Sequence, residues 1–431
     1  MQKISLSFIN KINSLQKSFI SQSIGQTFKL LAKIFISIMY ARYLGPAGFG
    51  ELNYAIALTG IIGPLGGFGM KQNLGALLCE DYEREALISN GLVISILGRI
   101  ITCLIFIPII YLTENITIKK LLFIFIIGEF FNVSEIFEVE LLNIGRGAKI
   151  AKIISYQVLI ELILSINAVF LNAGIIKLAC IQSIGIFLKA VLLSLEVKRI
   201  KFIILFRSID LNLIKKILIR SFPLFLSSLF VLLYMKSDQI LLEWIKGPEQ
   251  VGQYSIAVKC SECLFFLPVI LCQNYLPKIG GNNLEDNQKN NFLSEMYKTS
   301  WILGLFMMFL NLFIFPKLVP IVFGNEYNPA CSALIFLAPG AFGVACGCAS
   351  NTWLNRRGYL KIILRRSLVG AIFNIILDLF LIPKYGFNGA AIATSISYLL
   401  SFFHVVIYNG NFYKHILEIT YPFNKSIKIS D

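Results

Sequence analysis

Charged side chains inside long apolar runs are the residues of this sequence that could do chemistry. The first such run carries six polar residues spaced three or four apart, which places them on one face of a helix: Gln22, Gln26, Lys29, Lys33, Ser37 and Tyr40. No acid in that run neutralises its two lysines. A charge at the bilayer centre costs about 2.5–3.5 kcal/mol even on a lenient scale, so each lysine needs water or a partner. The stripe therefore predicts a path that attracts phosphate, unless Lys29 reaches the membrane edge and Lys33 pairs with an acid on another helix.

Four other basic residues join the two lysines as candidate substrate-binding groups: Arg42, Arg99, Lys236 and Lys259. Arg99 lies in the middle of an apolar run and requires either a partner or a ligand. Lys259 and Glu262 are three residues apart, so they can pair on one helix face instead of contacting substrate.

Acidic residues in the apolar runs are candidates for binding a coupling ion: Glu129, Glu161, Asp238, Glu262 and Asp378. A buried carboxylate can carry a proton or coordinate a cation. The alternative is that these acids form salt bridges between helices, with Lys29, Lys33, Arg99 or Lys259. The sequence leaves both interpretations open.

The apolar runs extend along the whole chain. Of 431 residues, 56% are hydrophobic and 15% are charged, against about a quarter charged in a soluble domain. Runs of about 20 residues predict twelve membrane-spanning helices, near 20–41, 50–70, 88–112, 121–143, 153–171, 175–196, 218–243, 251–276, 299–316, 330–354, 362–382 and 388–410. The fold class is therefore an all-α polytopic membrane protein.

The basic residues set the expected orientation. If the N-terminus is cytoplasmic, the inner segments carry 25 Lys and Arg and the outer segments carry 7. The positive-inside rule then places both termini in the cytoplasm. The net charge of +15 is accordingly a sign of topology and does not indicate nucleic-acid binding.

An internal repeat indicates two halves. The segment beginning Gly45-Pro46 precedes the second expected helix, as the segment beginning Gly247-Pro248 precedes the eighth, and Gly174 is matched by Gly386. We expect two six-helix lobes related by an axis along the membrane normal, with a central site between them. The predicted boundaries are an N-terminal lobe at 1–196, a basic cytoplasmic linker at 197–217, a C-terminal lobe at 218–410 and a cytoplasmic tail at 411–431.

Three motifs resemble those of Wzx-type O-antigen and polysaccharide flippases. They are Arg42-Tyr43-Leu44-Gly45-Pro46-Ala47-Gly48-Phe49-Gly50, Gly252-Gln253-Tyr254, and Gly386-Phe387-Asn388-Gly389-Ala390-Ala391-Ile392-Ala393-Thr394. Asp238 is similar to a recurrent acid of that family. The resemblance implies the fold of the multidrug/oligosaccharidyl-lipid/polysaccharide (MOP) exporters, which includes the MATE transporters. It also implies alternating access that moves undecaprenyl-diphosphate-linked oligosaccharide from the inner to the outer leaflet of the bacterial inner membrane.

An enzyme is not expected. There is no Walker A pattern, no metal-ligand spacing around His404 or His415, and no loop long enough for a catalytic domain. The sequence predicts no cofactor and no metal. The expected partners are the lipid-linked glycan, membrane lipids, H⁺ or Na⁺ as coupling ion, and the polymerase and other assembly proteins. A MATE-like, cation-coupled multidrug antiporter is the alternative.

Overall fold

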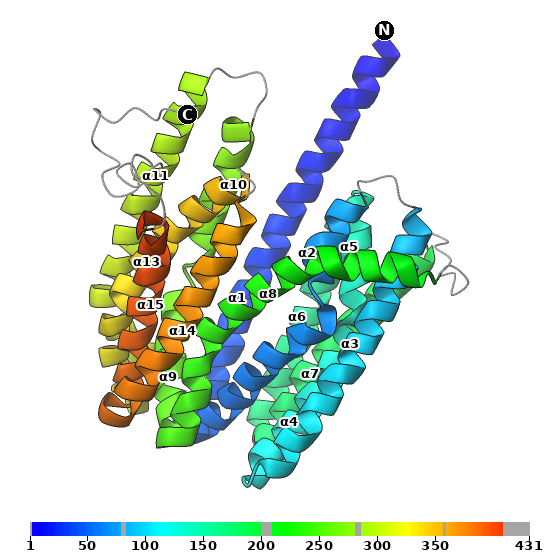
Figure 1. The fold of residues 1–431 in the computed structure, drawn as a ribbon. Helices are drawn as coiled ribbons and strands as arrows, with labels where there is room; N and C mark the ends of the chain where they lie inside the picture. Colours follow the sequence, from blue (N-terminus) through cyan, green and yellow to red (C-terminus); the bar gives the residue numbers. More distant parts are fainter. Residues whose placement is uncertain (1, 79–82, 200–208, 281–285, 357–358, 408–431) are drawn as a thin grey trace. The chain divides into compact units, whose positions relative to one another are not determined.

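The structure, a computed structural model, describes residues 2–78, 83–199, 209–280, 286–356 and 359–407 (Figure 1). Within these ranges the chain is helical apart from short connections, with no strand. Nine of the described helices are long and apolar enough to cross a membrane. Backbone groups inside a bilayer must bond to one another, which helices achieve within a single segment. The prediction of an all-α, multi-pass membrane protein is therefore confirmed.

The nine helices relate simply to the twelve expected ones. The apolar stretch Ile24–Gly67 contains the first two expected spans, which meet at a kink at Gly45. The fourth expected span is divided into two shorter helices, and the twelfth is the shorter apolar helix Phe387–Phe402. The count of twelve and the cytoplasmic termini stay predictions. The tail 411–431 and linker residues 200–208 lie outside the described residues, while helices cover both ends of the linker.

The chain forms two compact units. Unit 1 comprises Met1–Leu44 and Ala55–Leu229, and unit 2 comprises Gly45–Tyr54 and Phe230–Asp431. Segment 45–54 overlaps the first of the three motifs that resemble the flippases. It belongs to unit 2 with the C-terminal part of the chain, although it follows the first expected span in the sequence.

Unit 1 contains most of α1 and all elements up to the start of α8. Its elements are α1 (Gln2–Ile62), the 3-10 segment η1 (Gly63–Gly67), α2 (Met70–Leu77), α3 (Arg84–Leu112), α4 (Ile116–Phe130), the 3-10 segment η2 (Phe131–Ser134), α5 (Glu135–Asn143), α6 (Gly147–Phe170), α7 (Gly174–Arg199) and the first part of α8 (Leu211–Lys246). Helices α3, α4 and α7 pack side by side, and α6 packs on α7 (Figure 1).

Unit 1 contains two breaks with different causes. At η1 the sequence Gly63-Pro64-Leu65-Gly66-Gly67 removes a backbone donor and adds flexible glycines, so the helix ends there. At η2 the sequence holds neither glycine nor proline, and the expected single helix at 121–143 is instead α4, η2 and α5. The second break was not predicted.

Unit 2 is centred on α13. Its elements are the rest of α8, α9 (Pro248–Glu262), α10 (Phe266–Gly280), α11 (Asp286–Phe309), the π-helical segment η4 (Leu310–Ile314), α12 (Phe315–Phe323), the 3-10 segment η5 (Asn325–Tyr327), α13 (Ala330–Arg356), α14 (Leu360–Tyr385) and α15 (Phe387–Ile407). Helix α13 packs against α15, α11 and α9. Small buried residues such as Ala341, Ala345 and Ala349 allow this close approach.

The internal repeat is visible in the backbone. Gly45 and Gly247 have φ angles of 65° and 86°, and Gly174 and Gly386 have φ angles of 75° and 57°. These left-handed conformations favour glycine, so each pair marks the same kind of turn in both halves of the sequence.

The two Gly-Pro segments of the repeat pack in close backbone contact with each other inside unit 2. A β-carbon on Gly50 would collide with the carbonyl oxygen of Pro248, and one on Gly252 would collide with that of Pro46. The contact is reciprocal, because the glycine of each segment receives the proline carbonyl of the other. We call residues 46–50 and 248–252 the glycine clasp. It holds segment 45–54 against the start of α9.

Candidate functional site

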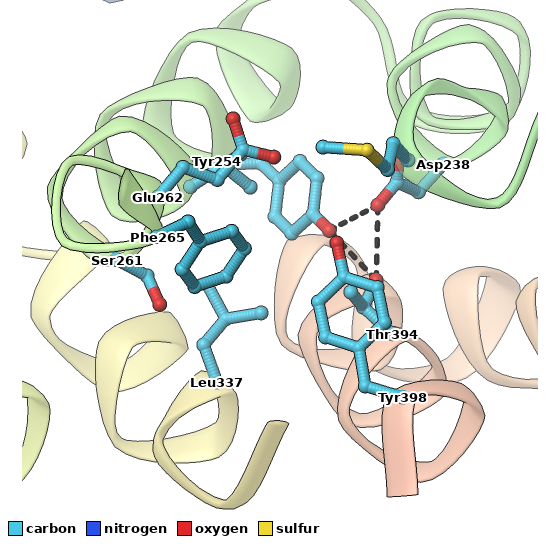
Figure 2. Close-up of a pocket in the computed structure, with 10 residues that line it drawn as sticks. Asp238, Tyr254, Ser261, Glu262, Phe265, Leu337, Thr394 and Tyr398 are labelled. Carbon is cyan, nitrogen blue, oxygen red and sulfur yellow. Dashed lines mark hydrogen bonds between the residues drawn. The ribbon is translucent and has the colours of Figure 1, made fainter. Parts of the chain in front are cut away.

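A buried carboxylate lies in unit 2 where side chains from α8, α9 and α15 meet (Figure 2). Asp238 of α8 is 1% exposed. One of its oxygens, Oδ2, accepts hydrogen bonds from the Tyr254 hydroxyl and, at 3.0 Å, from the Thr394 hydroxyl. The other, Oδ1, accepts the backbone N–H of Gln239 at 2.9 Å. Tyr254 and Thr394 belong to two of the three motifs and Asp238 is the intramembrane acid named beside them, and the three side chains form one hydrogen-bonded group.

A second carboxylate, that of Asp378 in α14, lies near the first. Asp378 is fully buried, neither of its oxygens has a hydrogen-bond partner among the described residues, and it feels the charge of Asp238. One helical turn away, Asn374 accepts a hydrogen bond from Ser237 at 2.9 Å, and its amide nitrogen is unpartnered. We call Asp238, Tyr254, Asn374, Asp378 and Thr394 the acid cluster.

The acid cluster has the composition of a site for one small cation. Carboxylate, hydroxyl and amide oxygens are the ligands that hard cations prefer, and a buried carboxylate can instead hold a proton. Among the described residues no group of three or more His, Cys, Asp or Glu is placed to hold a metal ion. Two carboxylates with neutral oxygens can hold a small cation or a proton.

A cavity adjoins the acid cluster and leads away from it between α9, α13 and α15 (Figure 2). It is small and has room for about one water molecule. Asp238 and Thr394 line one part of it, and Ser261 and Glu262 line another. Glu262 forms an ion pair with Lys236 at 3.9 Å.

The other basic candidates are placed differently. The Lys259 ammonium group lies 4.5 Å from the ring centre of Phe49, a residue of the segment that joins unit 2 through the glycine clasp. Lys29 and Arg42 both lie in α1, where Lys29 is half-buried and Arg42 is exposed.

In unit 1, Lys33 of α1 forms an ion pair with Glu161 of α6. The Glu161 side chain is fully buried and also accepts a hydrogen bond from Gln157 at 3.0 Å, while the Lys33 side chain is 41% exposed. Farther along the same two helices, Tyr40 and Ser165 share a hydrogen bond of 2.7 Å. At Lys33 and Tyr40 the polar stripe of α1 therefore faces α6. The structure shows the alternative in which Lys33 pairs with an acid on another helix.

Arg99 is the second paired cation of unit 1. Its guanidinium donates to Glu129 of α4 and, at 2.8 Å, to the carbonyl oxygen of Gly63 in η1. Glu129 also accepts from Asn132 at 2.7 Å. The Arg99 side chain is 4% exposed, so Glu129 neutralises its charge inside the protein. Through these two contacts the guanidinium links the break at η1 to α4.

The structure thus brings eight of the eleven candidates together in four pairs: Lys33 with Glu161, Arg99 with Glu129, Lys236 with Glu262, and Asp238 with Asp378. Their roles as substrate or ion ligands stay predictions.

Arg366 is a residue that sequence reasoning missed, since it was counted among the cytoplasmic basic residues. It is 8% exposed, it donates to Ser401 and to the carbonyl oxygen of Gly347 at 3.3 Å each, and its Nη1 has no partner. The signal for it was its position inside the expected span 362–382, where a charged residue requires a partner or water.

Two family models match the sequence. One, described as "Polysaccharide biosynthesis protein", matches residues 15–266, which is more than half of the chain. The other, described as "MatE", matches residues 223–380.

Among individual proteins, the chain is similar to the capsular polysaccharide biosynthesis protein CapF of Staphylococcus aureus. The two are 24% identical over 417 residues, which are 93% of this chain and 99% of CapF. Two solved structures share the fold. The lipid II flippase MurJ in an inward closed conformation has a TM-score of 0.73 at 19% identity, with 93% of this chain and 90% of MurJ covered. An inward-facing multidrug resistance MATE family transporter of the MOP superfamily has a TM-score of 0.69 at 16% identity, with 95% and 99% covered.

Proposed function

The chain belongs to the polysaccharide biosynthesis protein family, and from this premise we propose that it is a flippase for lipid-linked oligosaccharide. It moves an undecaprenyl-diphosphate-linked repeat unit from the inner to the outer leaflet of the bacterial cytoplasmic membrane by alternating access. The glycan is an O-antigen, capsular or similar unit. The family match and the similarity to CapF support the substrate class, and the MOP fold supports transport as the activity.

The observation that carries ion coupling is the pair of buried carboxylates in the acid cluster. Asp378 has no basic partner among the described residues, so a charged Asp378 inside the membrane is costly unless a cation or proton joins it. We infer that Asp238 and Asp378 bind the coupling ion, Na⁺ or H⁺, with Thr394 and Asn374 as the neutral ligands. Coupling follows when the site binds the ion more tightly in one conformation than in the other, because ion binding then shifts the equilibrium between the two conformations.

Lys33 is the best placed of the paired cations for the diphosphate. Its side chain is 41% exposed, compared with 25% for Lys236 and 4% for Arg99. An ammonium group carries three donors, so Lys33 can hold Glu161 and still donate to a phosphate oxygen. Lys29, Arg42 and Lys259 complete the proposed set of substrate contacts.

The test is deletion of the gene followed by analysis of what accumulates. A flippase deletion leaves undecaprenyl-linked repeat units on the inner leaflet and removes surface polysaccharide. Complementation with the wild-type gene restores display, and Asp238→Asn or Asp378→Asn does not. The control is Glu249→Gln, an exposed acid in the first turn of α9, which restores it.

Two other outcomes would reject the flippase. Normal surface polysaccharide in the deletion strain excludes the proposed activity. Sensitivity to cationic drugs without accumulated lipid-linked glycan assigns the chain instead to the multidrug antiporters, whose family model matches residues 223–380.

A further inference from the structure

Asp238 is much more deeply buried than Glu262 and Lys236. Asp238 is 1% exposed and Tyr398 is 8% exposed, whereas the side chains of Glu262 and Lys236 are 24% and 25% exposed. Asp238, Lys236 and Glu262 lie in helices long and apolar enough to cross a membrane, and Tyr398 lies in the shorter apolar helix Phe387–Phe402. A charged pair that is a quarter exposed on such helices requires an aqueous surface, because lipid would not solvate it. Glu262 and Lys236 therefore mark the side from which water reaches the cavity.

The cavity borders both zones. Glu262 and Ser261 line it near the exposed pair, Asp238 and Thr394 line it at the buried end, and the Tyr254 ring lies between Glu262 and Asp238 (Figure 2). Tyr398 lines the same cavity as both carboxylates. Most of the lining is apolar, and the hydroxyl oxygens of Tyr254 and Thr394 are the ligands that a small cation would meet beside Asp238.

Lys236 forms an ion pair with Glu262, the more exposed of the two carboxylates that line the cavity. Its ammonium nitrogen is 3.9 Å from Glu262 Oε2, and its charge also reaches Asp238. A tethered ammonium group is chemically a competitor for the cation, because it presents a positive charge to the same two acids. Cations approaching Glu262 must displace it or wait until the pair opens.

We propose that Glu262 is the entrance through which the coupling cation reaches Asp238, and that Lys236 closes this entrance by pairing with Glu262. The inference rests on the proposed cation coupling at the acid cluster and adds two residues to it. Glu262 acts on the rate of entry, since a carboxylate at the mouth of a low-dielectric cavity raises the local cation concentration by tenfold or more. Lys236 acts as the gate.

The experiment measures cation binding by the purified full chain in nanodiscs. Radioactive ²²Na⁺ gives the equilibrium affinity and the association rate at constant ionic strength. If the wild-type chain binds no ²²Na⁺, the same variants are tested for H⁺ uptake with a pH-sensitive dye in weak buffer. The variants are Glu262→Gln, Lys236→Met and Lys236→Arg. The controls are Glu249→Gln on α9 and Lys246→Met on α8, both exposed.

We expect Glu262→Gln to slow association about tenfold while the dissociation constant changes less than about threefold, because the ligands at Asp238 remain. Lys236→Met should speed association, and Lys236→Arg, which keeps the ion pair, should not. The controls should match the wild type. If Glu262→Gln fails to fold, the contrast between Lys236→Met and Lys236→Arg still decides whether the pair is a gate.

Several results would overturn the inference. Association at the wild-type rate in Glu262→Gln excludes an entrance, and loss of equilibrium binding in that variant makes Glu262 a ligand instead. Equal rates in Lys236→Met and Lys236→Arg exclude the gate. Asp238→Asn tests the coupling site separately from the entrance. If this variant binds cations as the wild type does, Asp238 is not part of the coupling site, whatever the result for Glu262→Gln. A wild-type chain that binds neither cation removes both.

Discussion

The α-carbon of Gly50 lies against the carbonyl oxygen of Pro248, and no side chain fits between them. Gly50→Ala should therefore force segment 45–54 away from α9. We expect a lower melting temperature and less protein in the membrane, as in other changes that overpack a tight contact, which cost about 1–3 kcal/mol. Thermal unfolding in detergent, followed by intrinsic fluorescence, measures the effect.

The same helix supplies a matched control for this prediction. A β-carbon on Gly60 would meet nothing within 4 Å, so Gly60→Ala should leave stability unchanged or raise it by about 0.5–1 kcal/mol. Gly252→Ala, the reciprocal position of the glycine clasp, should behave like Gly50→Ala. A Gly50→Ala protein as stable as the wild type would mean that the clasp is not a fixed contact.

The ion pair between Lys33 and Glu161 gives a second prediction. Lys33→Met removes the ammonium partner of the fully buried Glu161 carboxylate, which keeps its hydrogen bond from the Gln157 amide. Removing one partner of a buried hydrogen-bonded pair costs about 1–3 kcal/mol, so the melting temperature should fall. The double variant Lys33→Met/Glu161→Gln removes both charges and should recover part of the loss.

Surface display in the same strains separates the two roles of Lys33. If Lys33 also contacts the diphosphate, the double variant should stay defective in display although its abundance recovers. Normal display at normal abundance in the double variant would remove Lys33 from the substrate path and leave it a structural residue.

The hydroxyl group of Thr394 should set the cation affinity of the acid cluster. It donates to Asp238 at 3.0 Å and lies 2.9 Å from the Tyr254 hydroxyl. Changes to groups that orient a metal ligand cost about 10–100-fold in affinity, so we expect Thr394→Val to weaken cation binding at least tenfold. Thr394→Ser keeps the hydroxyl and should bind like the wild type. Binding isotherms for both variants test this, and equal affinities would exclude Thr394 from the site.

Sequence patterns pointed to several residues of the acid cluster. Asp238 and Asp378 were identified as acids in apolar runs, and Tyr254 and Thr394 belong to the motifs that resemble the flippases. Patterns of this kind report which face of a helix is polar. They do not report which other helix that face meets.

Pairings over long sequence distances were therefore beyond prediction. Lys33 and Glu161 are 128 positions apart, and Arg99 and Glu129 belong to different helices, so their meeting depends on how helices pack. At η1 the glycines and the proline account for the break. The break at η2 was not predicted, because Phe131–Ser134 carries no residue that disfavours a helix strongly.

Two buried arginines provide a final, contrasting prediction. Arg99 is paired with Glu129, whereas Arg366 has no carboxylate partner among the described residues and one unpartnered nitrogen. An unpaired buried charge costs several kcal/mol, and replacing it with an apolar side chain of similar length removes that cost. The Arg366→Met protein should therefore have a melting temperature equal to or above that of the wild type. The Arg99→Met protein should have a lower melting temperature, because Glu129 loses its basic partner. Arg366→Met that folds stably but fails to restore surface polysaccharide would show that the guanidinium serves transport. A large fall in its melting temperature would contradict the prediction and show that a group outside the described residues neutralises it.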